Sequence, residues 1–268
     1  MKSVADQRPL VIGHRGASAL APENTIVAFE QAMRDGADGI EFDVRLARDR
    51  VVVVIRDATL RRTGLSEGDV AGLTSRELNR VDVGTWFNLR HPLLAQQAYA
   101  QARVPTLAEV FELFSERAAL LYVEMKCAGG EGRALAGEVA RLVRDHSLID
   151  SVVVESFTYE AIVEIKRIDS SIRTAALFEP KLARPFPSMR KMIQRAQECR
   201  ADEMALHRSL AGRRITEEAA RVGLNTVVWT VDNPSWLQRA KRYGVHAIIT
   251  NNPALMRAGS TGKKVSDG

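Results

Sequence analysis

Short apolar runs rich in valine and isoleucine alternate with amphipathic helical stretches along almost the whole chain of 268 residues. Runs of this kind are typical of strands in a parallel sheet that is buried on both faces. The expected strands are residues 10–14, 39–46, 51–55, 120–126, 152–157, 173–178, 203–206, 226–231 and 247–250. The expected helices are residues 24–34, 106–115, 133–145, 159–168, 189–199, 217–222 and 235–243. About eight strands that alternate with helices predict a single α/β domain, a closed (β/α)8 barrel of the TIM type.

A doubly wound open sheet is the alternative arrangement for such an alternation. Sheets of that type usually carry a glycine-rich turn, G-x-G-x-x-G, after an early strand. The sequence has no such turn, which favours the barrel. Residues 57–105 show weak periodicity and predict an insertion near the barrel mouth, within a barrel domain that spans residues 1–258. The polar residues 259–268 predict a flexible tail.

The composition is that of an ordinary globular protein, with 38 basic and 33 acidic side chains and a formal charge of +5. This mild positive field suits anionic substrates. The basic side chains are scattered rather than clustered, so no nucleic-acid partner is expected. Cys127 and Cys199 are too few for a disulfide framework. The polar N-terminus lacks an apolar signal segment, and no apolar run approaches the ~20 residues of a membrane span, which predicts a cytoplasmic protein without stable membrane insertion.

Charged and aromatic side chains mark the ends of several expected strands, where a barrel of this type carries its catalytic groups. These side chains are His14, Arg15, Glu41, Asp43, Glu124, Lys126 and Trp229. Glu41 and Asp43 lie two residues apart, so their side chains point to the same face of the sheet. Acidic side chains are costly inside an apolar sheet unless they are paired or bind a metal.

Glu41, Asp43 and Glu124 therefore predict a site for a divalent cation, Mg²⁺ or Ca²⁺, because both ions prefer oxygen ligands. The alternative is that each carboxylate pairs with a nearby cation such as Arg15 or Lys126. The third carboxylate and the position at strand ends favour the metal site.

His14, followed by Arg15 and Gly16 and placed beside the acidic residues, predicts a proton-transfer group. Arg15 can bind phosphate oxygens in a bidentate fashion, and Lys126 can supply a further positive charge. Gly16 has no side chain and predicts a close approach of the backbone to a ligand.

Further short motifs accompany these strand ends in a fixed order. They are His14-Arg15-Gly16, Pro22-Glu23-Asn24-Thr25, Glu41-Phe42-Asp43, Asp57-Ala58-Thr59-Leu60-Arg61-Arg62-Thr63, Val104-Pro105-Thr106-Leu107, Glu124-Met125-Lys126, Ser156-Phe157, Trp229-Thr230-Val231, and Gly244-Val245 followed by Ile249-Thr250. In this order and spacing the sequence resembles the glycerophosphodiester phosphodiesterases from about residue 10 to residue 253. Because several motifs match together, the resemblance is more specific than any one motif alone.

The resemblance implies hydrolysis of small glycerophosphodiesters to glycerol 3-phosphate and an alcohol. It implies two histidines that act as an acid–base pair across the phosphorus, of which His14 is the first. The metal ligands that it implies are Glu41, Asp43 and Glu124. The expected substrate-binding residues are Arg15, Lys126 and Trp229.

The second catalytic position departs from the family, which has a histidine where this sequence has Arg56. Arginine has a pKa above ~12 and does not release its proton in a protein. Arg56 therefore cannot replace the second proton carrier, and a rate loss of about 10²–10⁴-fold is expected. Its guanidinium can still bind phosphate.

Three explanations for Arg56 are open. The arginine is a deliberate replacement that traps a substrate or product, or the natural protein is a non-catalytic pseudo-enzyme that binds phosphodiesters. In the third explanation another histidine, His91 or His207, carries the proton. A separate alternative is a phospholipase D-like enzyme that acts on intact lipids, and it requires an exposed apolar surface, for which 86–87 and 93–94 are the candidate segments.

Overall fold

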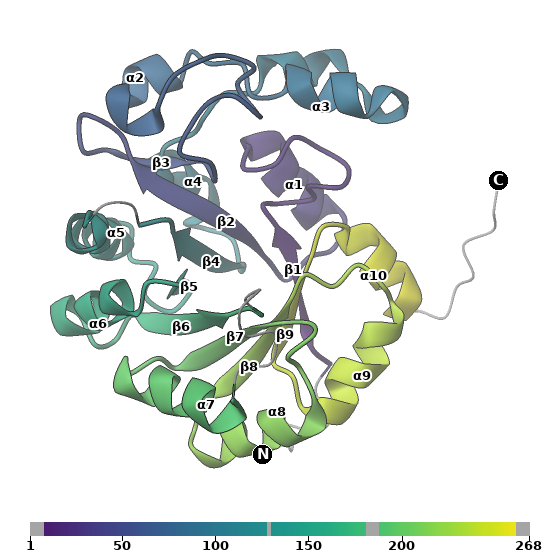
Figure 1. Cartoon of the computed structure of the whole chain (residues 1–268). Coiled ribbons are helices and arrows are strands. Elements are labelled where there is room, and N and C mark those ends of the chain that lie inside the picture. Colours follow the sequence, from purple (N-terminus) through teal and green to yellow (C-terminus); the bar gives the residue numbers. More distant parts are fainter. Residues whose placement is uncertain (1–7, 128–129, 181–187, 261–268) are drawn as a thin grey trace.

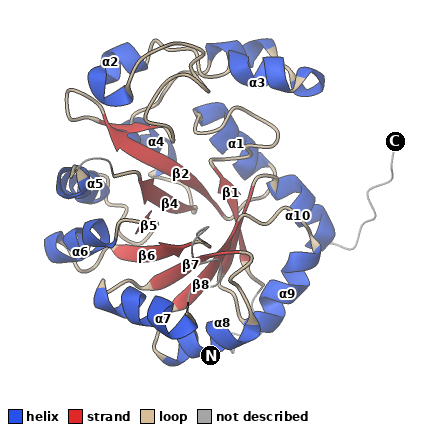
Figure 2. Ribbon diagram, in the orientation of Figure 1, coloured by secondary structure: helices blue, strands red, loops and turns tan. Residues whose placement is uncertain are grey.

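Eight parallel strands form a closed barrel at the centre of the molecule, and helices surround it (Figure 1, Figure 2). The computed structural model describes residues 8–127, 130–180 and 188–260. The barrel strands are β1 (Leu10–His14), β2 (Gly39–Leu46), β4 (Leu120–Met125), β5 (Val152–Ser156), β6 (Arg173–Phe178), β7 (Glu203–His207), β8 (Asn225–Trp229) and β9 (Ala247–Thr250). Each strand pairs with its neighbours in order around the ring, and pairing of β1 with both β9 and β2 closes it. The predicted barrel is therefore confirmed.

The ninth strand, β3 (Val52–Val54), pairs antiparallel with β2 and lies outside the closed ring. It returns the chain toward the barrel mouth. Position 56, two residues after the end of β3, is thereby placed near the strand ends that carry the other predicted site residues.

The surrounding helices alternate with the barrel strands along the chain. They are α1 (Ile26–Arg34), α4 (Leu107–Phe114), α5 (Gly132–Asp145), α6 (Tyr159–Ile168), α7 (Met189–Glu198), α8 (Arg213–Arg221), α9 (Ser235–Tyr243) and α10 (Pro253–Ser260). Thr25 caps the N-terminus of α1, since its hydroxyl accepts a hydrogen bond from the Ala28 N–H. Thr106 and Glu109 form a capping box at the start of α4.

Alternation along the barrel strands separates two apolar layers. Ile40 and Phe42 of β2 point outward and pack against the helices, whereas Tyr122 of β4 and Val153 of β5 point inward and fill the barrel interior. Toward the carboxyl ends of β2, β4 and β5, the inward-facing residues are acidic. The same alternation that builds the core therefore directs Glu41, Glu124 and Glu155 into the barrel mouth.

Residues 57–105 form a set of short helical turns that lie together beside β3 and α1 (Figure 1). They contain α2 (Ser75–Leu78), α3 (Thr85–Arg90) and the 3₁₀ turns Val70–Gly72, Pro92–Leu94 and Gln97–Gln101. Buried Leu60, Leu78 and Val83 form an apolar cluster with Val53 of β3. Helices this short depend on such packing, because their intrinsic stability in water is marginal.

Two helices differ from expectation. The helix expected at 217–222 begins earlier, because Ile215 and Thr216 are buried in the first turn of α8. No helix was expected at α10, where Asn252 Oδ1 accepts a hydrogen bond from the Leu255 N–H and Met256 is fully buried.

The tail predicted at 259–268 lies, beyond Ser260, outside the described residues. In the described part of the chain, no helix has the length and apolar character needed to cross a membrane.

Candidate active site and metal centre

A cavity of about 250 Å³ opens among the carboxyl ends of the barrel strands. Its lining includes seven of the eight residues predicted for the site: His14, Arg15, Glu41, Arg56, Glu124, Lys126 and Trp229. The eighth, Asp43, is fully buried and contacts the lining residues Arg15 and Lys126. Residues that are far apart in sequence thus meet in one place. They lie on or directly after β1, β2, β4 and β8, and Arg56 lies in the segment that follows β3.

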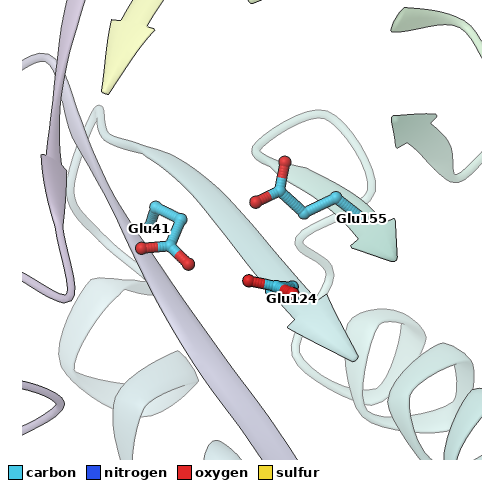
Figure 3. Close-up of side chains that lie close together, drawn as sticks. All are labelled: Glu41, Glu124 and Glu155. Carbon is cyan, nitrogen blue, oxygen red and sulfur yellow. The ribbon is translucent and has the colours of Figure 1, made fainter. Parts of the chain in front are cut away.

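Three buried glutamates converge in the cavity (Figure 3). Glu41, Glu124 and Glu155 come from the adjacent strands β2, β4 and β5, and one oxygen of each lies within 4.8 Å of one oxygen of the others. Burial, followed by the charge of Asp43, raises the pKa of Glu124 to about 7. The pKa values of Glu41 and Glu155 are raised well above the ordinary 4.5, first by burial and then by neighbouring carboxylates. A cluster of this kind favours a hard divalent cation that balances its charge.

Asp43 is held by two cations and an amide. Its Oδ2 lies 3.0 Å from Arg15 Nε and accepts a 2.9 Å hydrogen bond from Asn24 Nδ2, while its Oδ1 lies 3.0 Å from Lys126 Nζ. Burial alone would raise the pKa of Asp43, but the charges of Arg15 and Lys126 outweigh burial and lower it. The carboxylate is therefore charged, and it fixes the two cations that face the cavity. A role of Asp43 as metal ligand stays a prediction.

Two hydrogen-bonded residues orient His14: Asn251, which follows β9, and Asp232, which follows β8. Asn251 Nδ2 donates to Asp232 Oδ2 (2.7 Å), so Asn251 Oδ1 faces His14 Nδ1 at 2.6 Å. Because an amide oxygen can only accept, Nδ1 donates, and Nε2 carries the free lone pair. Nε2 lies 3.8 Å from Glu41 Oε2. Burial and the nearby charge of Arg15 lower the pKa of His14 to about 4.

The turn after β1 has an unusual backbone. Arg15 has a φ of +53°, and its N–H donates to Glu41 Oε2 (3.0 Å). Gly16 has a φ of +81°, and a Cβ at this position would lie 2.5 Å from the carbonyl of Ala28 in α1. The close approach that Gly16 permits in the structure is to α1; an approach of its backbone to a ligand stays a prediction.

A series of ion pairs between arginines and carboxylates runs from Arg56 to Arg15 at the end of β1. Arg56 Nη1 lies 2.9 Å from Asp57 Oδ1, and Arg62 Nε lies 2.6 Å from Asp57 Oδ2. Arg62 also pairs with Glu23 (2.7 Å), which in turn pairs with Arg15 (3.0 Å). The guanidinium of Arg56 lies at the outer end of this chain with 44% of its side chain exposed.

Two aromatic side chains, Phe157 and Trp229, line part of the cavity. The indole Nε1 of Trp229 donates to the carbonyl of Ala205 (3.1 Å), which fixes the ring. Phe157 packs edge-on against Trp229 with centroids 5.8 Å apart, and Lys126 Nζ lies 6.0 Å from the Phe157 centroid. The two rings offer an apolar surface next to three cations.

The two other candidate histidines, His91 and His207, are not among the described residues that line the cavity, although His207 contacts the lining residue Trp229. His91 packs on Phe87 in the insertion, with ring centroids 4.6 Å apart. His207 packs against Trp229 at 5.3 Å, and its Nδ1 pairs with the Ser209 hydroxyl. Both rings therefore make packing contacts in the structure, and a role of either in proton transfer stays a prediction.

Sequence reasoning missed Glu155, Asn251 and Asp232. Glu155 carries the same signal that identifies Glu41 and Glu124, an acidic residue in an apolar strand, directly before the Ser156-Phe157 motif. Asn251 and Asp232 follow β9 and β8 in loops without periodicity, and no local signal identifies them.

Comparison with known proteins gives a consistent result. A model described as the glycerophosphoryl diester phosphodiesterase family matches residues 14–255. A glycerophosphodiester phosphodiesterase of Caldanaerobacter subterraneus is 31% identical over 251 residues, which cover 93% of this chain and 96% of the relative. The structure of an Oleispira antarctica phosphodiesterase with its product sn-glycerol-3-phosphate has a TM-score of 0.84 at 24% identity, and the match covers 97% of this chain and 100% of that one. A glycerophosphodiester phosphodiesterase of Agrobacterium tumefaciens has a TM-score of 0.75 at 27% identity, with 93% and 99% covered.

Proposed function

Because the chain belongs to the glycerophosphoryl diester phosphodiesterase family, we propose that it hydrolyses glycerophosphodiesters to glycerol 3-phosphate and an alcohol with a bound divalent metal, and that Arg56 slows this reaction. The observation that carries the proposal is the convergence of three cations, one oriented histidine and buried carboxylates in a single cavity. A phosphodiester needs a cationic environment for its anionic oxygens, and hydrolysis needs proton carriers.

Arg15 and Lys126 are suited to bind the phosphate. Both are held by Asp43, so their positive ends are fixed before a substrate enters, and no reorganisation is needed when charge builds on the phosphoryl oxygens. Arg56 adds a third cation at the rim. Trp229 and Phe157 then provide the surface on which the carbon part of the substrate packs.

The carboxylates of Glu41, Asp43 and Glu124 are the ligands proposed for the metal. When bound, a divalent ion neutralises charge on the phosphoryl oxygens and activates an oxygen nucleophile. His14 is proposed to accept or return a proton at Nε2, because its Nδ1 is engaged by Asn251. Asn251 thereby holds the imidazole in the tautomer that this task requires.

Arg56 removes the second proton carrier without removing positive charge. The guanidinium stays protonated at any pH of interest, so it binds phosphate but cannot protonate a departing alkoxide by cycling its charge. We therefore expect substrate affinity to survive better than turnover.

Release of glycerol 3-phosphate from glycerophosphocholine tests the proposal. The assay compares the chain with its Arg56→His variant, with Mg²⁺, with Ca²⁺ and with a chelator. We expect metal-dependent turnover to rise by about 10²–10⁴-fold in the variant. Equal metal-dependent activity in both proteins would show that another group carries the proton. No turnover in either protein, with phosphodiester binding retained in calorimetry, would favour a binding pseudo-enzyme.

Action on intact lipids is the second candidate function, and side chains of the insertion favour it. Leu89 is 71% exposed and Leu93 is 99% exposed, so the segment around α3 presents apolar side chains outward. Phe87, in contrast, is fully buried and does not contribute. Release of a head group from phospholipid vesicles, absent with soluble diesters, would support this function over the first.

A further inference from the structure

Glu155 is a buried carboxylate in which one oxygen, Oε2, has no hydrogen-bond partner among the described residues. Its side chain is 1% exposed. The neighbouring carboxylates are engaged: Lys126 Nζ lies 2.5 Å from Glu124 Oε1, and the Arg15 N–H donates to Glu41. A buried polar group without a partner is costly, so its retention in the cavity wall requires an explanation.

A second buried carboxylate in the same barrel, that of Glu203, has a hydrogen-bond donor and serves as a comparison. Glu203 on β7 is also 1% exposed, but its Oε2 accepts a 2.9 Å hydrogen bond from the Tyr122 hydroxyl. Tyr122 lies in the apolar interior below the cavity. The Oε2 of Glu155 has no such donor among the described residues, and the carboxylate points toward Glu41 and Glu124 (Figure 3). The difference indicates that Glu155 faces a ligand and is not simply a packed core residue.

The charges around the cavity support a cation as that ligand. Asp43, Glu41, Glu124 and Glu155 contribute four negative charges when ionised, and Arg15 and Lys126 face them. The two cations balance half of this charge, and one divalent ion balances the rest.

We propose that Glu155 is an additional ligand of the divalent ion, beyond Glu41, Asp43 and Glu124, and that it makes the site prefer Ca²⁺ to Mg²⁺. The inference rests on the proposed metal-dependent function. Ca²⁺ accepts six to eight oxygen ligands in flexible geometry, whereas Mg²⁺ keeps several waters and usually takes one or two carboxylates. Carboxylates from adjacent strands that already lie within 4.8 Å of one another suit the larger ion.

Isothermal titration calorimetry with CaCl₂ and MgCl₂ on the chelator-treated full chain tests the proposal independently of turnover. We expect Ca²⁺ to bind one ion per chain, more tightly than Mg²⁺ by at least about tenfold. Since even groups that only support a metal ligand contribute about 10–100-fold to affinity, Glu155→Gln should weaken Ca²⁺ binding at least as much. The ratio of Ca²⁺ to Mg²⁺ affinity should fall with it.

Glu203→Gln is the matched control, because it neutralises a carboxylate of equal burial that has its own donor. Its Ca²⁺ affinity should stay within about twofold of the parent value. Thermal unfolding adds a second readout: Glu155→Gln should melt higher than the parent without metal, since repulsion is relieved, and should gain less from added Ca²⁺. Unchanged Ca²⁺ affinity in Glu155→Gln, or tighter Mg²⁺ than Ca²⁺ binding by the parent, would overturn the proposal. Absence of turnover with intact Ca²⁺ binding would count against the hydrolytic function alone.

Discussion

Replacement of Glu203 by glutamine should raise the free energy of unfolding at pH 8 and change that free energy little at pH 4. Glu203 is 1% exposed inside the barrel, and burial raises its pKa to about 7. The hydrogen bond from Tyr122 and the charge of Arg173 lower the pKa only in part. Glutamine keeps an oxygen that accepts from Tyr122, but it has no charge to desolvate.

The sign follows from the two pKa values. In the unfolded chain the carboxyl loses its proton near its ordinary pKa of 4.5, whereas in the folded chain it retains the proton up to about pH 7. Between these values the folded state binds more protons, so the free energy of unfolding falls as pH rises, by ~1.4 kcal/mol per pH unit. Across the window the loss is about 3 kcal/mol, which Glu203→Gln should recover.

Urea unfolding at pH 5, 6, 7 and 8 in the presence of a chelator measures the effect as the difference between variant and parent. The exposed Glu116 serves as control, because Glu116→Gln removes a carboxylate that was never desolvated. Glu203 also contributes to the raised pKa of Glu155, so the pair should be measured in a Glu155→Gln background as well. A difference that stays constant with pH, within about 0.5 kcal/mol, would refute the argument that burial keeps Glu203 protonated.

Two further substitutions test the site and the turn that supports it. In the Arg56→His background, Asn251→Ala should lower kcat by on the order of tenfold or more with little change in KM, because His14 loses the acceptor that fixes its tautomer; a change in KM alone would contradict this. Gly16→Ala should lower the free energy of unfolding by about 2 kcal/mol or more, because a Cβ would lie 2.5 Å from backbone of α1. Gly223→Ala has the same φ of +81° but open space around it, so thermal melts should show a cost of only about 1 kcal/mol.

The barrel and most of its cavity were predictable because both follow from local pattern. Apolar strands at regular intervals specify the ring, and charged residues at the ends of those strands specify where side chains gather. The positions of Glu41, Glu124 and Lys126 in the cavity lining follow from strand alternation alone. Glu155 obeys the same rule and was within reach of the same reasoning.

The remaining features depend on contacts between distant parts of the chain. His14 meets Asn251 across 237 residues, and Arg62 meets Glu23 across 39, and neither pair leaves a periodic signal. The short helix α2 has a capping box of Thr74 and Glu77, but a helix of four residues also depends on the packing of Leu78 in the insertion. Tertiary context decides such features, so a single sequence does not reveal them.

The position of Arg56 makes its replacement by histidine a test of chemistry rather than of folding. Its side chain is 44% exposed, and the one ion pair found for it among the described residues is with the adjacent Asp57. Asp57 keeps its contact with Arg62 when Arg56 is changed, so the chain of charges that reaches Glu23 stays intact. A surface ion pair contributes about 0–1 kcal/mol, which is too little to alter the population of folded protein. A rise in turnover in Arg56→His would therefore report a restored proton carrier, and unchanged turnover would remove position 56 from the reaction.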